Sequence, residues 1–170
     1  TGMYMSEKFD GVRAIWDGTN FISRGNQIYN APEWFTHCLP KDTVLDGELH
    51  MGRGNFVKAS GAARQKKPSN EKWKNMKFNV FDIPNPKTVL LPFKERIKLF
   101  EKVVSECNSR WSSESLPGNV DKSLSCPIEA SNQILVKNMD HAYQYYKDVI
   151  INGAEGLILR DANSSYQFNR

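Results

Sequence analysis

One lysine near the start of the chain constrains it most, because it lies in Lys8-Phe9-Asp10-Gly11-Val12-Arg13, directly before a stretch of alternating residues. Val12, Ala14 and Trp16 fall on one side of that alternation, which predicts a strand with one buried face. A lysine at the mouth of a strand can act as a nucleophile when neighbouring cations, a metal or desolvation favour its neutral amine. A solvated surface lysine is the alternative, and the rest of the chain decides between them.

Length and composition describe one ordinary globular domain. The chain has 170 residues, of which 39% are hydrophobic and 25% charged. This is enough for one core and hardly for two, so we treat residues 1–170 as one domain. No apolar run reaches the ~18 residues of a membrane-spanning helix. The net charge of +4 is compatible with a polyanionic partner without identifying one.

The cysteines and histidines do not suggest a metal site. Cys38, Cys107 and Cys126 are odd in number and lack metal-ligand spacing, and the three histidines are scattered. We expect free thiols in a reducing compartment, with a Cys107–Cys126 bridge as the alternative.

A turn at Asp17-Gly18-Thr19-Asn20 predicts a β-hairpin over residues 12–25. In such a hairpin Arg24 would return alongside the strand that carries Lys8, where its planar guanidinium could bind a phosphate. An exposed strand charge is the other interpretation of Arg24.

Asp46-Gly47-Glu48 interrupts an apolar strand over residues 44–49. Carboxylates in such a strand either face solvent or form part of a site, because burying them is costly. Taken alone, the pattern favours a bulged strand with solvated carboxylates.

Basic residues surround Trp73 between residues 58 and 77. Lysines around an exposed aromatic are typical of a surface that follows a nucleic-acid backbone, although a solvated loop is equally compatible. The candidate DNA-contacting residues are Arg64, Lys66, Lys67, Lys72 and Lys74.

The remaining pattern indicates an α+β chain. We expect strands over residues 78–83, 133–137 and 154–160, a helix over 92–107 and a surface loop over 108–127. A second helix is expected from an Asp140 cap to Gly153. Its core stripe would be Ala142, Tyr143, Tyr146, Val149 and Ile150.

Five motifs occur together in a fixed order. They are Lys8-Phe9-Asp10-Gly11-Val12-Arg13, Ser23-Arg24-Gly25, Asp46-Gly47-Glu48, Phe81-Asp82 and Glu155-Gly156. In this order the chain resembles, over essentially its whole length, the adenylation domain of ATP-dependent DNA ligases, and it is most similar to the small bacterial type. The resemblance implies an ATP-grasp-like nucleotidyltransferase fold: two antiparallel sheets flanked by helices, with the nucleotide between them.

The resemblance also implies a role for each motif. Lys8 would attack the α-phosphorus of ATP and become lysyl-AMP. Glu48 would hold the ribose, Phe81 would stack on adenine, and Glu155 would bind Mg²⁺. The implied phosphate-binding or supporting cations are Arg13, Arg24, Arg160 and Arg170.

Resembling ligases continue with a lysine-rich motif and an OB-fold domain, which the pattern here stops short of. We therefore expect nucleotide binding, inefficient self-adenylation and negligible sealing of nicked double-stranded DNA by this chain alone. We also expect a monomer without a membrane anchor and an intracellular location, with nucleus, bacterial cytoplasm and periplasm all left open.

Other functions remain open from the sequence. An RNA ligase or an mRNA capping enzyme uses the same chemistry, although capping enzymes typically carry Asp-Gly where this chain has Glu155-Gly156. An NAD-dependent ligase is disfavoured because no nicotinamide-binding module precedes Lys8. A non-catalytic nucleic-acid-binding fragment would need the basic residues but neither Glu48 nor Glu155.

Overall fold

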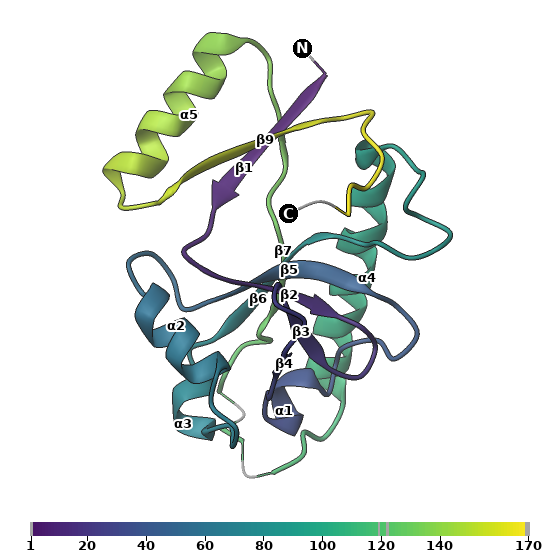
Figure 1. Ribbon diagram of the computed structural model, residues 1–170, viewed down its shortest axis with the longest axis vertical. Helices are drawn as coiled ribbons and strands as arrows, with labels where there is room; N and C mark the ends of the chain where they lie inside the picture. Colours follow the sequence, from purple (N-terminus) through teal and green to yellow (C-terminus); the bar gives the residue numbers. More distant parts are fainter. Residues whose placement is uncertain (1, 119, 122, 169–170) are drawn as a thin grey trace.

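The computed structural model describes residues 2–118, 120–121 and 123–168, and it contains two β-sheets flanked by helices (Figure 1). The strands are β1 (Met3–Lys8), β2 (Gly11–Trp16), β3 (Phe21–Ser23), β4 (Ile28–Tyr29), β5 (Leu45–His50), β6 (Lys77–Asp82), β7 (Ile128–Ala130), β8 (Ile134–Leu135) and β9 (Gly156–Asp161). The helices are α1 (Glu33–Thr36), α2 (Phe56–Ala63), α3 (Asn70–Trp73), α4 (Phe93–Ser113) and α5 (Met139–Ile151).

The larger sheet has the order β4-β3-β2-β5-β6-β7, and the smaller sheet has the order β8-β1-β9. Both sheets are antiparallel except for the β6–β7 pair, which is parallel. That exception arises because α4 forms the long crossover that a parallel connection requires. The predicted α+β class and two-sheet arrangement are confirmed.

The β2–β3 hairpin follows the sequence pattern closely. Val12, Ala14 and Trp16 are buried, as the alternation predicted. At the turn, Gly18 has a φ of +102°, and a Cβ there would lie 2.5 Å from the Lys41 carbonyl oxygen. Only glycine fits this position without strain.

An aromatic core lies beneath the larger sheet. The ring centroids of Phe21 and Phe78 are 4.8 Å apart, and Phe35 and Trp73 are also separated by 4.8 Å. Trp73 is fully buried, so the expectation of an exposed aromatic among the lysines was wrong. The short helix α3 directs Trp73 inward while its neighbours Lys72 and Lys74 stay exposed.

Helix α4 extends six residues beyond its predicted end, into the serine-rich segment expected to be a loop. Polar residues are accommodated there by hydrogen bonds to the backbone. The Asn108 side chain donates to the Val104 carbonyl, and the Ser109 and Ser113 hydroxyls donate to carbonyls one turn back. The polar composition therefore marked a solvent-facing helical end, and irregular structure begins only afterwards.

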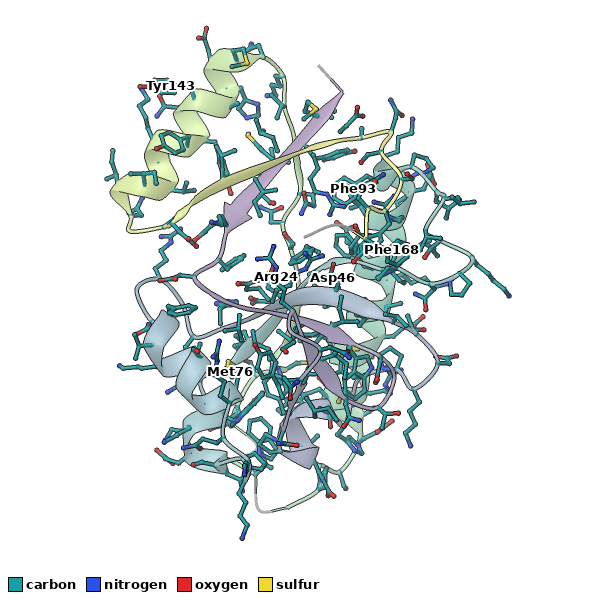
Figure 2. The ribbon with its side chains drawn as sticks, viewed as in Figure 1. Arg24, Asp46, Met76, Phe93, Tyr143 and Phe168 are labelled. Atoms are coloured by element: carbon teal, nitrogen blue, oxygen red, sulfur yellow. The ribbon has the colours of Figure 1, made fainter. Side chains whose placement is uncertain are left out.

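The smaller sheet supports α5 through a narrow core. Met5 of β1 packs with Val136 and Ala142. Tyr143 lies on the outer side of α5 and is 61% exposed, so the predicted broad stripe is wrong for Tyr143, Tyr146 and Ile150 (Figure 2). A three-stranded sheet covers only part of a helix face, which explains the difference. The helix cap is Asn138, whose side chain accepts from the His141 amide, rather than Asp140.

Three segments connect the sheets. Residues 9–10 link β1 to β2, residues 131–133 link β7 to β8, and residues 162–168 return from β9 across the larger sheet. The returning segment is fixed by backbone hydrogen bonds, including Tyr166 N–H to the Val89 carbonyl. The space between the sheets therefore receives side chains from both of them.

Two further findings concern single residue classes. All three cysteines are free, as expected, and no Cys107–Cys126 bridge forms. Among the residues that the structure describes, no helix is both long enough and apolar enough to cross a membrane.

Candidate active site

A cavity of ≈ 560 Å³ opens between the two sheets. Residues from motifs far apart in the sequence line it, and they come from strands of both sheets. The predicted site residues among them are Lys8, Arg13, Glu48, Phe81, Glu155 and Arg160.

Lys8 lies at the end of β1, opposite the start of β9. Its Nζ is 3.0 Å from Oε1 of Glu155, and both side chains remain about half exposed. Ion pairs this accessible contribute little to stability. The amine is thus held at the cavity wall by a contact that a ligand can replace at low cost.

A row of polar residues crosses the larger sheet beneath the cavity. Arg13 of β2 pairs with Glu48 of β5, Glu48 pairs with Asn79 of β6, and Asn79 pairs with Glu129 of β7. Residues directly opposite one another share a face of the sheet. The pairing register therefore presents cation, carboxylate and amide side by side.

Burial raises the pKa of Glu48 to about 7, and the nearby negative charge of Glu155 raises it further, while Arg13 acts in the opposite direction. The two glutamates therefore repel each other inside the cavity. A cation or a hydrogen-bond donor placed there would relieve that repulsion.

Glu48→Gln is expected to raise the free energy of unfolding by about 1–3 kcal/mol at pH 8, with little effect near pH 4. The folded state holds the Glu48 proton more tightly than the unfolded chain. Native Glu48 therefore becomes a destabilising charge as the pH rises from 4.5 to about 7. Urea denaturation at both pH values measures the difference, and the exposed Glu101→Gln is the matched control. An equal effect at both pH values would show that the Glu48 carboxylate is not destabilised.

Asp46 is fully buried, which corrects the prediction that the carboxylates of its motif are solvated. Burial is tolerated because Asp46 is paired twice. Arg13 donates to it through Nε at 3.1 Å and Nη2 at 2.7 Å, and the Tyr166 hydroxyl donates at 2.7 Å. The hydrogen bonds to Asp46 raise the pKa of Arg13. Arg13 is therefore a fixed, permanently charged donor at the cavity wall.

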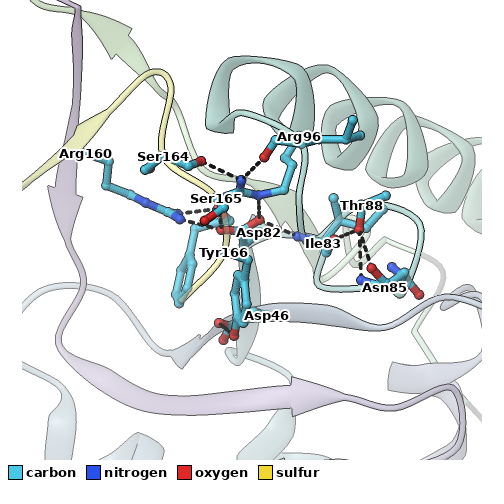
Figure 3. A network of polar contacts seen from close by, with 12 residues as sticks. Asp46, Asp82, Ile83, Asn85, Thr88, Arg96, Arg160, Ser164, Ser165 and Tyr166 are labelled. Atoms are coloured by element: carbon cyan, nitrogen blue, oxygen red, sulfur yellow. Dashed lines mark hydrogen bonds and ion pairs between the residues drawn. The ribbon is translucent and has the colours of Figure 1, made fainter. Parts of the chain in front are cut away.

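Asp82 forms a second buried anchor, drawn with its partners in Figure 3. Arg96 donates to it through Nε at 2.8 Å and Nη2 at 3.2 Å. Arg160, from the smaller sheet, also donates to Asp82 and to the Phe81 carbonyl. Arg160 thus joins the two sheets beside the cavity, and its donors are already engaged.

These motifs and this geometry agree with what the chain matches. The family described as "ATP dependent DNA ligase domain" matches residues 1–170. The chain belongs to this family.

Relatives of known sequence and structure support the assignment. A DNA ligase of Haemophilus influenzae is 30% identical over 169 residues, which is 99% of this chain and 55% of that protein. A Lig E DNA ligase structure superposes with a TM-score of 0.78 and 27% identity, over 98% of this chain and 57% of that one. Chlorella virus DNA ligase-adenylate, at 18% identity and a TM-score of 0.74, shares the fold. The chain thus spans little more than half the length of these relatives.

Not all residues expected from the family resemblance converge on the cavity. Arg24 lines a separate groove with Arg13, Ile22 and Tyr166, and it follows β3 in the larger sheet. The expectation that Arg24 returns alongside the strand of Lys8 is therefore wrong, because β1 belongs to the smaller sheet (Figure 2). Arg170 lies outside the described residues.

The basic residues form a different surface. They are exposed on and between α2 and α3, and none of them lines the cavity. We call this set the α2–α3 basic surface, and it consists of Arg64, Lys66, Lys67, Lys72 and Lys74.

Several site residues were not found from the sequence. Tyr166 and Arg96 act on buried aspartates that lie far from them in the chain, so no local pattern marks them. Asn79 had a detectable signal, since it alternates with Phe81 on β6 and so shares the cavity face. Gln133 lies in a connection between sheets, where sequence periodicity carries no information.

Proposed function

We propose that this chain forms a covalent lysyl-adenylate on Lys8, the first step of sealing nicks in DNA. The observation that carries the proposal is the placement of Lys8 Nζ, 3.0 Å from Glu155, in a cavity shared with Arg13, Glu48 and Phe81. No other lysine among the described residues lines that cavity.

The chain's own residues divide the work of the reaction. Phe81 stacks on the adenine and Glu48 accepts hydrogen bonds from the ribose, which fixes the nucleotide. Arg13, held by Asp46, donates to a phosphate. The Lys8 amine, after losing a proton, attacks the α-phosphorus; its bond to phosphorus forms as the bond to pyrophosphate breaks. Fixing both reactants in this geometry can lower the barrier by ~7–11 kcal/mol.

A magnesium ion fits the donor set. Glu155 would hold it, with Glu48 nearby, because carboxylate oxygens are the ligands Mg²⁺ prefers and these two carboxylates repel each other without a cation. When bound, the ion supplies positive charge that offsets the charge on the phosphates.

Labelled ATP tests the proposal. Label on the α-phosphate should remain with the chain after denaturing electrophoresis, whereas label on the γ-phosphate should leave with pyrophosphate. Adduct formation should require Mg²⁺. Retention of the γ-label, or no adduct from either nucleotide even at long incubation, would contradict the proposal.

Phe81→Ala is expected to weaken ATP binding by ~1–3 kcal/mol, the range for stacking a base on an aromatic ring. Isothermal titration calorimetry measures the change. Phe168→Ala, a substitution of a 77% exposed phenylalanine outside the cavity, is the matched control. Unchanged affinity in Phe81→Ala would mean that this ring only packs.

The α2–α3 basic surface is the candidate DNA interface in the same proposal. Its charges would contact phosphates of nicked double-stranded DNA. The Lig E structure it resembles was described under the words "DNA binding with a minimal scaffold", which supports this view. An OB-fold domain elsewhere in the full-length protein and a monomeric state belong to the proposal as well.

A charge-matched pair of variants tests the interface. Replacing Arg64, Lys66 and Lys67 together by alanine should weaken DNA binding and flatten its salt dependence by up to about 3 phosphate contacts. Replacing Lys94, Lys98 and Lys102, which are exposed on α4, removes the same charge elsewhere. Equal losses in both variants would show that only net charge matters.

A further inference from the structure

Two unpartnered oxygens lie beside the nucleotide cavity. In the described part of the chain, three buried side-chain polar atoms have no hydrogen-bond partner: Trp73 Nε1, Asn79 Oδ1 and Gln133 Oε1. Trp73 belongs to the core, whereas Asn79 and Gln133 both line the cavity. Leaving a buried acceptor unpaired costs about 1–3 kcal/mol, so such atoms in a native structure call for an explanation.

The orientation of the Asn79 amide is fixed by its neighbours. Asn79 is 4% exposed, and its Nδ2 donates to Oε1 of Glu129 at 3.2 Å. The same oxygen lies 2.7 Å from Nε2 of His50. Burial alone would raise the pKa of Glu129, but the hydrogen bonds from His50 and Asn79 lower it. An ionised carboxylate only accepts, so it holds the amide nitrogen and turns Oδ1 the other way.

Gln133 approaches from the segment that connects the sheets. Its Nε2 donates to the Ser131 hydroxyl at 2.9 Å, and the Ser131 backbone amide donates to the Val80 carbonyl of β6 at 2.8 Å. Ser131 itself is 3% exposed. Gln133 is thus tied to the same strand that carries Asn79 and Phe81, and its oxygen is left without a donor.

The acceptors lie close to the expected position of the base. Asn79 and Phe81 are two residues apart on β6 and therefore share its cavity face. A ring stacked on Phe81 would present its edge to neighbouring polar groups. Stacking itself tolerates any purine, so Phe81 cannot choose between adenine and guanine.

We propose that Asn79 and Gln133 are specificity-determining residues whose amide oxygens accept the hydrogens of the exocyclic 6-amino group of adenine. This inference rests on the proposed lysyl-adenylate function. One amino group carries two hydrogens and can satisfy two acceptors. Guanine has a carbonyl oxygen at that position, which would face both acceptors and leave them unpaired. The pocket thus rejects GTP as well as attracting ATP.

Equilibrium binding of three triphosphates tests the proposal without requiring activity. ATP carries the 6-amino group, purine riboside triphosphate carries hydrogen at that position, and GTP carries oxygen. The unmodified chain should bind ATP at least about tenfold tighter than purine riboside triphosphate, and GTP should bind more weakly still. Gln133→Met keeps the side-chain length and removes the acceptor. It should weaken ATP binding about fivefold while leaving purine riboside triphosphate within about twofold.

Controls separate the possible outcomes. Gln144→Met, on the exposed face of α5, should change no affinity. Asn79→Leu should behave as Gln133→Met does, and its affinity for purine riboside triphosphate reports whether the site is intact. Equal losses for ATP and purine riboside triphosphate, or equal affinity of the unmodified chain for both, would overturn base reading alone. Failure of the unmodified chain to bind any nucleotide would instead overturn the proposed function.

Discussion

Lys8→Ala is expected to abolish formation of the covalent nucleotide adduct. Adduct formation needs a nucleophilic amine within the cavity, and Lys8 supplies the only lysine lining it among the described residues. The fold should be unaffected, because the ion pair with Glu155 is about half exposed and stabilises little. Incubation with α-labelled ATP and denaturing electrophoresis measures the adduct.

Two controls make the Lys8 result specific. Lys98→Ala removes an exposed lysine of α4 and should label normally. Circular dichroism and ATP binding show whether Lys8→Ala remains folded with its pocket formed. Label that persists on folded Lys8→Ala would assign the chemistry to another residue.

Arg96→Met is expected to lower the free energy of unfolding by about 3–5 kcal/mol, the cost of leaving a buried charge without its partner. Arg96 and Asp82 are both fully buried. Arg96 also donates to the Leu91 and Ser164 carbonyls, so the substitution releases the segment that returns across the larger sheet. A loss of this size is a large fraction of the ~5–15 kcal/mol that stabilises a typical domain.

Urea denaturation measures this loss. Lys98→Met lies on the same helix and is exposed, so it should change stability by no more than about 0.5 kcal/mol. If Arg96→Met lost less than about 1 kcal/mol, Arg160 alone would be sufficient to compensate Asp82.

The two buried aspartates connect stability with the proposed chemistry. Asp46 and Asp82 are cross-strand partners on β5 and β6. Asp46 fixes Arg13 at the cavity wall, while Asp82 joins Arg96 of α4 to Arg160 of the smaller sheet. Both are reached by the segment after β9, through Tyr166 and Ser164. The polar groups that hold the sheets together therefore also position the site.

Local patterns predicted the elements whose burial follows from their own sequence. The alternation at Val12, Ala14 and Trp16 and the apolar stripe of α4 both appear in the structure. The order of the five motifs predicted that Lys8, Glu48 and Glu155 would meet, although they lie on different strands. Their meeting depends on the fold, which the motif order identified through the family resemblance.

Tertiary context decided the rest. Asp46 resembles a solvated acid in sequence, but two distant donors make its burial favourable. Trp73 is buried because α3 is amphipathic over a single turn, too short for a periodic signal. Tyr143 fits a core stripe yet remains exposed, because the sheet beneath α5 has only three strands. Hydrophobic patterns report a preference for burial, and the packing partner determines whether it occurs.

Peptide-level mass spectrometry after incubation with ATP and Mg²⁺ tests the central claim most directly. The account predicts one adenylyl group, attached through phosphorus to the side-chain nitrogen of Lys8, even if only a small fraction of the chain reacts. The modified peptide should be absent when ATP is replaced by a nucleotide analogue that cannot release pyrophosphate. An adenylyl group on any other residue, or none on Lys8 under conditions where ATP is bound, would contradict it.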